Sequence, residues 1–213
     1  MNQEKRNFDH GASSWDENPL RVKLADDVAS ALRREITFTK NMDVLDYGCG
    51  TGLITLRIQP FVNTVTGIDS SEGMLKVLND KISRQKLTNV STRHLDMEAG
   101  EGLQDKFHLI VSSMTMHHIQ QPEALIKRLS ERLHAEGYLC IADLDPEDGL
   151  FHGENRGVFH HGFDRIHVKG MFEKAGFQHI IVTTAAKVIK DVEEEGGGGG
   201  SREFKVFLVC GQK

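Results

Sequence analysis

The chain has 213 residues, and at roughly 100–200 residues per domain this length favours a single domain. Its 26 Lys and Arg against 31 Asp and Glu give a formal charge of −5 without a basic run, which argues against nucleic-acid binding through phosphate neutralisation. Hydrophobic residues make up 38% of the chain and glycine adds 21 residues, an ordinary globular share that excludes wholesale disorder. The apolar stretches fall short of the ~18 residues of a membrane span, and the start MNQEKRNFDH lacks the apolar region of a secretory signal. We therefore expect a cytoplasmic protein without membrane insertion.

The cysteines indicate neither a disulfide framework nor a zinc knuckle. Cys49, Cys140 and Cys210 are odd in number, widely spaced and free of any C-x-x-C motif. Their apolar or glycine-rich surroundings predict packing residues. The sequence shows no heptad or exposed apolar stripe that would indicate an oligomeric state.

Residues 1–41 precede the first predicted strand and are expected to cap one end of a sheet. Asn18 and Pro19 predict the start of a helix. The apolar residues of that helix fall on one face, and the aromatic-bearing segment Phe8–Trp15 lies before it.

From Met42 onward, short β-type runs alternate with helical segments, which predicts βαβ units around a parallel sheet. The last two strands have no helix between them, so we expect an antiparallel hairpin across residues 187–202. The seven predicted strands are Asp43–Asp46, Val62–Ile68, Val90–His94, Leu109–Ser113, Tyr138–Ala142, Gln178–Thr184 and Phe204–Val209.

Three helices are predicted between these strands. Ser70 or Ser71 caps the first. Pro122 opens the second, in which leucine recurs every four residues up to Leu133 and which Gly137 is placed to end. Asp164 starts the third, which closes at Gly176.

The predicted core spans residues 42–186 and 203–211. A loop at 144–163 lies within it, and a second loop at 187–202 separates its two parts. Residues 144–163 lack periodicity but carry several Phe and His, which favours a lid over disorder. Residues 187–202 contain the run DVEEEGGGGGS and are predicted to be a flexible hairpin loop. The glycine-rich run 196–201 also resembles an engineered Gly-Ser linker.

The strongest functional signal is the segment VLDYGCGTGL at Val44–Leu53, a buried strand followed by an acidic residue and three glycines. Glycines at these positions let the backbone turn sharply and approach a ligand closely. A dinucleotide fingerprint needs its third glycine at position 53, which is Leu53, so a pyrophosphate cradle and a nicotinamide-dependent reductase are disfavoured. Asp69, at the end of the second strand, is placed to accept hydrogen bonds from both hydroxyls of a ribose.

With these motifs the sequence resembles the class I S-adenosylmethionine-dependent methyltransferases. It is most similar to the small-molecule branch called methyltransferase type 11 or 12, which includes the ubiquinone and menaquinone C-methyltransferases. The resemblance covers about Met42–Val209, with VLDYGCGTG, GIDSSEGML, STRHLDMEAG and FHLIVSSMTMHHI as motifs I to IV. It implies a Rossmann-like α/β fold: a seven-stranded, mostly parallel sheet of order 3-2-1-4-5-7-6, its last strand antiparallel, with helices on both faces. S-adenosyl-L-methionine would lie across the carboxyl ends of strands one to four, where ligands sit in open α/β sheets.

The resemblance also implies a role for each matching residue. Asp46 would orient the methionine amino group of the cofactor, and Asp69 would hold its ribose. The other implied cofactor contacts are the backbone of Gly48, Cys49 and Gly50, then Ser70 and Met74 beside the adenine, Asp96 on its exocyclic amine, the Met97 amide, and Ser112 and Ser113 near the sulfonium.

Methyl transfer by in-line displacement depends mainly on holding the reacting atoms together, and a base is needed only for a protonated nucleophile. Histidine suits that role near neutral pH, so His160 in the lid and His117 after the fourth strand are the predicted catalytic residues. No metal site is predicted, although His152, His160 and His161 with Asp143 or Asp145 could satisfy Zn²⁺.

The expected acceptor is a small, partly apolar molecule, because the aromatic residues of the cap and lid are available to line the pocket. The fourth strand lacks the Asn/Asp-Pro-Pro-Tyr motif of methyltransferases that act on bases, in agreement with the acidic charge. Two alternatives stay open: a protein or peptide methyltransferase, and a non-catalytic module that binds S-adenosylmethionine. The residues do not identify the acceptor atom.

Overall fold

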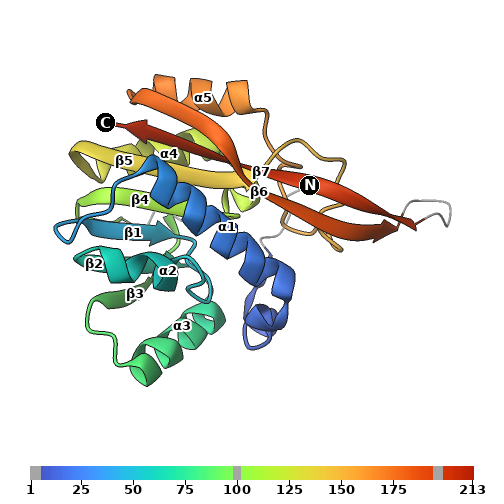
Figure 1. The fold of residues 1–213 in the computed structure, drawn as a ribbon, viewed down its shortest axis with the longest axis horizontal. Coiled ribbons are helices and arrows are strands. Elements are labelled where there is room, and N and C mark those ends of the chain that lie inside the picture. The colour runs from blue at the N-terminus through green and yellow to red at the C-terminus, as the bar shows by residue number, and fades with distance from the viewer. Residues whose placement is uncertain (1–5, 98–101, 194–198) are drawn as a thin grey trace.

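The computed structural model describes residues 6–97, 102–193 and 199–213. They form a seven-stranded sheet of order β3-β2-β1-β4-β5-β7-β6 flanked by helices (Figure 1). β7 is antiparallel to both β5 and β6, and the other neighbours are parallel, so the predicted fold class and strand order are confirmed. The strands are β1 Asp43–Tyr47, β2 Thr64–Asp69, β3 Val90–His94, β4 Phe107–Ser113, β5 Leu133–Leu144, β6 Gln178–Glu193 and β7 Gly199–Gln212.

The helices begin where capping residues predict. Asn18, Ser71 and Asp164 each accept a first-turn backbone N–H, at 2.9, 3.1 and 2.9 Å, which satisfies a donor that the helix leaves open. The α-helices are α1 Pro19–Glu35, α2 Thr55–Ile58, α3 Glu72–Gln85, α4 Pro122–Glu131 and α5 Arg165–Lys174. The short 3₁₀ helices are η1 Asp9–Gly11, η2 Trp15–Glu17, η3 Gln59–Phe61 and η5 Met116–His118.

One helix end was predicted wrongly. α4 stops at Glu131 instead of continuing towards Gly137, and Leu133 is already the first residue of β5, where it pairs with Phe107. Leu133 is fully buried, and a buried leucine fits the end of a helix and the start of a buried strand equally well. The short helix α2 was not predicted at all.

The predicted hairpin loop 187–202 was also wrong in extent. β6 and β7 stay paired as far as Glu193 opposite Gly199, so most of this stretch is strand, and the hairpin extends beyond the body of the molecule (Figure 1). Val188 and Val192 are buried while Lys187, Ile189 and Asp191 are exposed, an alternation typical of a strand with one covered face. Of the glycine-rich run, residues 196–198 lie outside the described residues.

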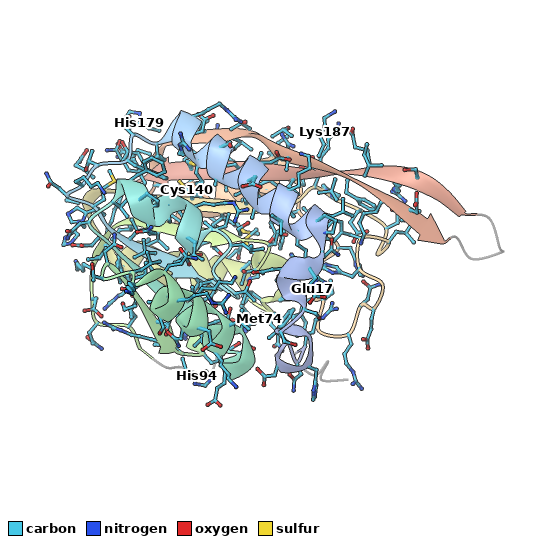
Figure 2. The ribbon with its side chains drawn as sticks, turned by 60° about the horizontal axis from the view of Figure 1, so that its bottom comes forward. Glu17, Met74, His94, Cys140, His179 and Lys187 are labelled. Carbon is cyan, nitrogen blue, oxygen red and sulfur yellow. The ribbon has the colours of Figure 1, made fainter. Side chains whose placement is uncertain are left out.

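Two apolar cores lie on opposite faces of the sheet. α1 and α2 cover one face, and α4 and α5 cover the other. Alternation along β4 supplies both cores, since Leu109 belongs to the first and Ile110 to the second. Figure 2 shows Met74 of α3 in the interior near the N-terminal segment and Lys187 on the outer side of the hairpin.

The cysteines are packing residues, as predicted, because all three are buried and free. Among the residues that the structure describes, none of the helices combines the length and the apolar character that crossing a bilayer requires.

Candidate active site

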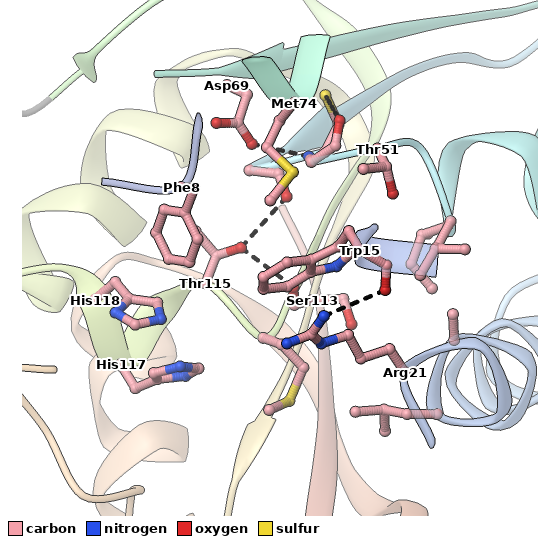
Figure 3. A pocket seen from close by; sticks show the side chains of 18 of the residues that line it. Phe8, Trp15, Arg21, Thr51, Asp69, Met74, Ser113, Thr115, His117 and His118 are labelled. Carbon is pink, nitrogen blue, oxygen red and sulfur yellow. Dashed lines mark hydrogen bonds between the residues drawn. The ribbon is translucent and has the colours of Figure 1, made fainter. Parts of the chain in front are cut away.

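A cavity of about 340 Å³ lies at the carboxyl ends of β1, β2 and β4 (Figure 3). The N-terminal segment covers it from one side with Phe8 and Trp15, and the loop after β5 contributes Phe151 and His152. Its position agrees with the general placement of ligand sites in open α/β sheets.

The glycine turn after β1 forms the floor of this cavity. Gly48, Gly50 and Gly52 have φ angles of +69°, +53° and +83°, in the left-handed region that favours glycine. A Cβ on Gly48 would stand 2.4 Å from Thr115 Oγ1, and one on Gly52 would stand 2.3 Å from a Leu78 methyl. Close packing thus excludes side chains at two of the three positions. At Gly50 a Cβ would meet nothing nearer than 4.0 Å, so a ligand can approach the backbone there.

Asp69 holds this turn in place from the end of β2. Its Oδ2 accepts the Gly50 N–H at 2.8 Å, as drawn in Figure 3, and its Oδ1 accepts the Ser71 N–H at 2.8 Å. Burial raises the pKa of Asp69, and the backbone N–H groups oppose that rise without cancelling it. A carboxylate has about four lone-pair positions, so these bonds to the backbone do not use all of its capacity to accept.

Asp46 is the most deeply buried carboxyl of the cavity wall, at 1% exposure. The Thr55 hydroxyl at the start of α2 donates to its Oδ2 at 2.5 Å. Burial raises the pKa of Asp46 to about 7, and the nearby charge of Asp69 adds to the rise. A cation placed beside Asp46 would favour its ionised form.

An ion-paired link fastens the N-terminal segment onto the glycine turn. The Thr51 hydroxyl donates to Asp16 Oδ1 at 2.6 Å, and Lys81 of α3 donates to Asp16 Oδ2 and, at 2.6 Å, to the Thr51 carbonyl. Above this link the Arg21 guanidinium lies 3.7 Å from the centre of the Trp15 ring. The cover is therefore held over the cavity by charge and stacking.

Histidines line the other end of the cavity. His117 Nδ1 lies 2.7 Å from Asp143 Oδ1, and both side chains are almost fully buried. Burial alone would raise the pKa of Asp143. The His117 ring and the N–H groups of Leu144 and His117 lower this pKa by more than burial raises it, so it lies below its ordinary value. Asp143 is thus ionised and accepts the Nδ1 proton of His117.

Two neighbouring imidazoles are neutral at pH 7. Burial, followed by the proximity of His117, lowers the pKa of His118 to about 4. The same causes lower the pKa of His152 to about 3. His118 Nδ1 lies 2.6 Å from the Gly157 carbonyl, which can only accept, so Nδ1 carries the proton.

Most of the predicted site residues lie around the cavity. Met97 and Ser112 are buried but do not line it, and the Met97 carbonyl accepts a hydrogen bond from Arg128. The predicted residues that line the cavity are Asp46, Gly48, Cys49, Gly50, Asp69, Ser70, Met74, Asp96, Ser113 and His117.

His160 lies elsewhere. It lines a second, more open depression that includes Gln120 and Phe163, and its Nε2 is 3.0 Å from the Ile119 carbonyl. The histidines that approach one another are His117, His118 and His152, with ring nitrogens within 4.8 Å. From the sequence, His152, His160 and His161 were instead considered together as possible Zn²⁺ ligands.

Several cavity residues were missed by the sequence analysis. Thr51 and Thr115 lie in turns with no repeating pattern, and Arg21 and Lys190 come from elements whose register was not known. Asp16 and Lys81 stand 65 positions apart in the chain, and no local signal links them.

The chain matches the family described as "Methyltransferase domain" over residues 38–176. An uncharacterized methyltransferase of Schizosaccharomyces pombe is 28% identical over 193 residues, which cover 84% of this chain and 67% of that protein. The ubiquinone biosynthesis O-methyltransferase of Coxiella burnetii is 27% identical over 128 residues, 60% of this chain and 51% of that protein. The chain thus spans about half the length of the second relative.

Solved structures share the fold. A SAM-dependent methyltransferase from Aquifex aeolicus superposes with a TM-score of 0.69 at 20% identity, over 97% of this chain and 99% of that one. Phosphoethanolamine N-methyltransferase 2 of Haemonchus contortus, in complex with S-adenosyl-L-methionine, gives a TM-score of 0.69 at 14% identity, over 88% of this chain and 52% of that one. Because the family match covers more than half of its residues, the chain belongs to the methyltransferase domain family.

Proposed function

We propose that the chain is an S-adenosylmethionine-dependent methyltransferase that transfers a methyl group by in-line displacement to a small, partly apolar acceptor. The observation that carries the proposal is Asp69, fixed by two backbone N–H groups beside the glycine turn on the cavity floor. The family match and the cofactor named for the Aquifex and Haemonchus structures support S-adenosylmethionine as the cofactor.

In this proposal Asp69 accepts hydrogen bonds from the two ribose hydroxyls. Asp46 receives the methionine ammonium group, a cation that stabilises its ionised form in a buried setting. Gly50 gives the cofactor close access to the backbone, and Gly48 allows the tight turn that packs against Thr115 beside it. Ser70, Met74 and Asp96 border the adenine, and Ser113 lies near the sulfonium.

The aromatic cover supports a partly apolar acceptor. Phe8, Trp15 and Phe151 line the cavity opposite the glycine turn, and Phe8 packs edge-on against both Trp15 and His118. Such a wall excludes water and holds a planar or aliphatic group. The relatives named above act on different acceptors, which include a ubiquinone precursor and phosphoethanolamine according to their names, so they do not fix the acceptor atom.

His117 is the catalytic residue of this proposal. Its Nδ1–H is held by Asp143, and its Nε2 belongs to a side chain of the cavity lining. His160 is not part of the proposal, because its ring is bonded to the Ile119 carbonyl outside that lining. A cytoplasmic location is kept from the sequence analysis and is tested by fractionating cells that express the chain.

The test is calorimetric titration of the parent and the Asp69→Ala variant with S-adenosylmethionine and its demethylated product. Two lost hydrogen bonds to a charged group are worth about 3–6 kcal/mol, which weakens binding on the order of 10²- to 10⁴-fold. Asp80→Ala, which removes an exposed carboxyl from α3, is the matched control and should bind like the parent.

Binding that is lost in Asp69→Ala and kept in Asp80→Ala justifies a screen of acceptors that begins with quinols, phenols and thiols. Absence of binding by the folded parent, or binding of a nicotinamide dinucleotide instead, overturns the proposal. Equal affinity of the two variants would show that Asp69 does not hold the ribose.

A further inference from the structure

Three histidines meet in the wall of the cavity. His117 and His118 belong to η5, just after β4, and His152 comes from the loop after β5. One ring nitrogen of each lies within 4.8 Å of the others. The ring centres are 4.1 Å apart for His117 and His118 and 4.9 Å apart for His117 and His152. Figure 3 shows His117 and His118 side by side near Phe8.

The hydrogen bonds of His117 and His118 occupy Nδ1 of each ring and leave Nε2 free for another partner. His117 donates from Nδ1 to Asp143, and His118 donates from Nδ1 to the Gly157 carbonyl, so Nε2 is the nitrogen of each ring that remains for a metal ion. Within the described part of the chain, Nε2 of His117 and Nε2 of His152 are buried and have no hydrogen-bond partner. Buried polar atoms are normally paired, and each exception calls for an explanation such as an ion that belongs there.

We propose that His117, His118 and His152 bind one divalent transition-metal ion of the zinc class, with Asp143 orienting His117. Three imidazoles are a known ligand set for Zn²⁺, and a ligating histidine commonly donates its other N–H to a carboxylate or a backbone carbonyl. Asp143 and the Gly157 carbonyl are in place for two of the three ligands.

The geometry requires only a small adjustment. Ligands about 2.1 Å from a tetrahedral ion stand roughly 3.4 Å apart, so nitrogens within 4.8 Å have to close by at most ~1.4 Å. His152 can supply this shift, because it lies in an irregular loop and is only partly buried, whereas His117 is fixed by Asp143. The loop is itself tied to the site, since the Phe159 N–H donates to the His117 carbonyl at 2.9 Å.

The surrounding charges are mixed. Lys190 lies over the Phe151 ring and Arg6 lies over the Phe8 ring, and both cations act electrostatically on His152. The buried carboxylate of Asp143 offsets part of this positive charge at the nearest ligand. We therefore expect the affinity to depend strongly on Asp143.

A three-histidine ion keeps a fourth position for water or substrate. Because all three histidines line the cavity, that position opens toward the acceptor. An acceptor hydroxyl or thiol bound there loses its proton to water more easily, its oxygen or sulfur forms the new bond to the methyl carbon, and the electron pair of the broken carbon–sulfur bond stays on the cofactor sulfur. This last step rests on the proposed methyl transfer, makes His117 a metal ligand in place of a base, and selects acceptors with an acidic O–H or S–H. The metal site itself does not rest on it.

The test is metal binding by the full chain, without a histidine tag and after treatment with a chelator. Zn²⁺ is titrated against a chromophoric chelator, the bound metal is counted by elemental analysis, and Co²⁺ gives an absorption spectrum that reports tetrahedral nitrogen ligands. We expect one equivalent of Zn²⁺ in the parent. Removal of a ligand in His152→Ala should weaken binding at least tenfold, and Asp143→Asn should weaken it about 10- to 100-fold.

The matched control is His161→Ala, which removes an exposed histidine from the same loop. It should bind Zn²⁺ like the parent. The proposal is overturned if the folded parent binds no stoichiometric Zn²⁺, or if His152→Ala and His161→Ala bind it equally well. His152 is a loop residue, so its variant decides the question even where substitution of buried His117 prevents folding.

A separate titration with S-adenosylmethionine distinguishes this proposal from the proposed function. His152→Ala should keep its cofactor affinity, because His152 lies at the acceptor end. Zn²⁺ binding without cofactor binding would leave the metal site standing and refute the methyltransferase, and the reverse result would do the opposite.

Discussion

Replacing Asp46 by asparagine tests the electrostatics of the cavity floor. In the folded parent the pKa of this buried carboxyl is about 7, against an ordinary value of 3.8. Between these two values the folded state holds a proton that the unfolded state has released. The stability of the parent therefore falls as the pH rises from 3.8 to about 7, and it stays level above that range.

The Asp46→Asn variant has no such dependence at this position. Its amide side chain keeps an oxygen that can accept the Thr55 hydroxyl, so the main change is loss of the ionisable group. Over the ~1.5 pH units between about pH 5.5 and pH 7, the free energy of unfolding of the parent falls by about 2 kcal/mol, at 1.36 kcal/mol per pH unit. The difference in the free energy of unfolding should therefore shift by about 2 kcal/mol in favour of the variant between pH 5.5 and pH 8.

The assay is urea unfolding of both proteins at these two pH values, followed by tryptophan fluorescence and circular dichroism. Trp15 is the single tryptophan and lies in the cover, so circular dichroism is needed to report on the sheet. Calorimetry with S-adenosylmethionine should show the opposite effect, with weaker binding by the variant above pH 7. A stability difference that is the same at both pH values would refute the argument, because it would mean that Asp46 ionises normally in the folded protein.

Three further substitutions test other parts of the site and the fold. Gly48→Ala places a methyl group 2.4 Å from Thr115 Oγ1 at a positive φ, so urea unfolding should show a loss of at least about 1–2 kcal/mol, and no loss would contradict the packing. Lys81→Ala breaks the link through Asp16, so calorimetry should show cofactor binding weakened several-fold while the melting temperature changes little; unchanged binding would mean that the cover closes without it. Gly170→Ala in α5 meets nothing within 4 Å and should raise the free energy of unfolding by about 0.5–1 kcal/mol, whereas destabilisation would show a hidden clash.

The central sheet was predictable because its signals are local. One buried strand leads into Asp46 and three glycines, and a second ends in Asp69. These residues mark the carboxyl ends of the strands before any contact is known. The extent of the hairpin could not be predicted, because the charged and glycine-rich composition of residues 187–202 is typical of a loop. Pairing between β6 and β7, with Val188 and Val192 buried on one face, outweighs that local preference.

The cover over the cavity shows a different limit. Asp16 and Lys81 are ordinary surface charges in the sequence, and only the position of α3 against the N-terminal segment brings them together. Trp15 and Phe8 were expected in the pocket because they are aromatic. The stacking of Arg21 on the Trp15 ring depends on the residue at which α1 begins.

The pairing of His117 with Asp143 lies between these cases. β4 and β5 were both predicted, as was their adjacency, and in the structure Ser113 pairs with Ala142 at their carboxyl ends. Residues that directly follow two paired positions lie close to each other. Asp143 is therefore expected near the segment just after Ser113, which contains His117. His152 does not follow from this rule, because it lies well beyond the end of β5 in a loop without periodicity. Strand order therefore predicts a contact for the first few residues past a strand end, and the third histidine could be found only from the folded loop.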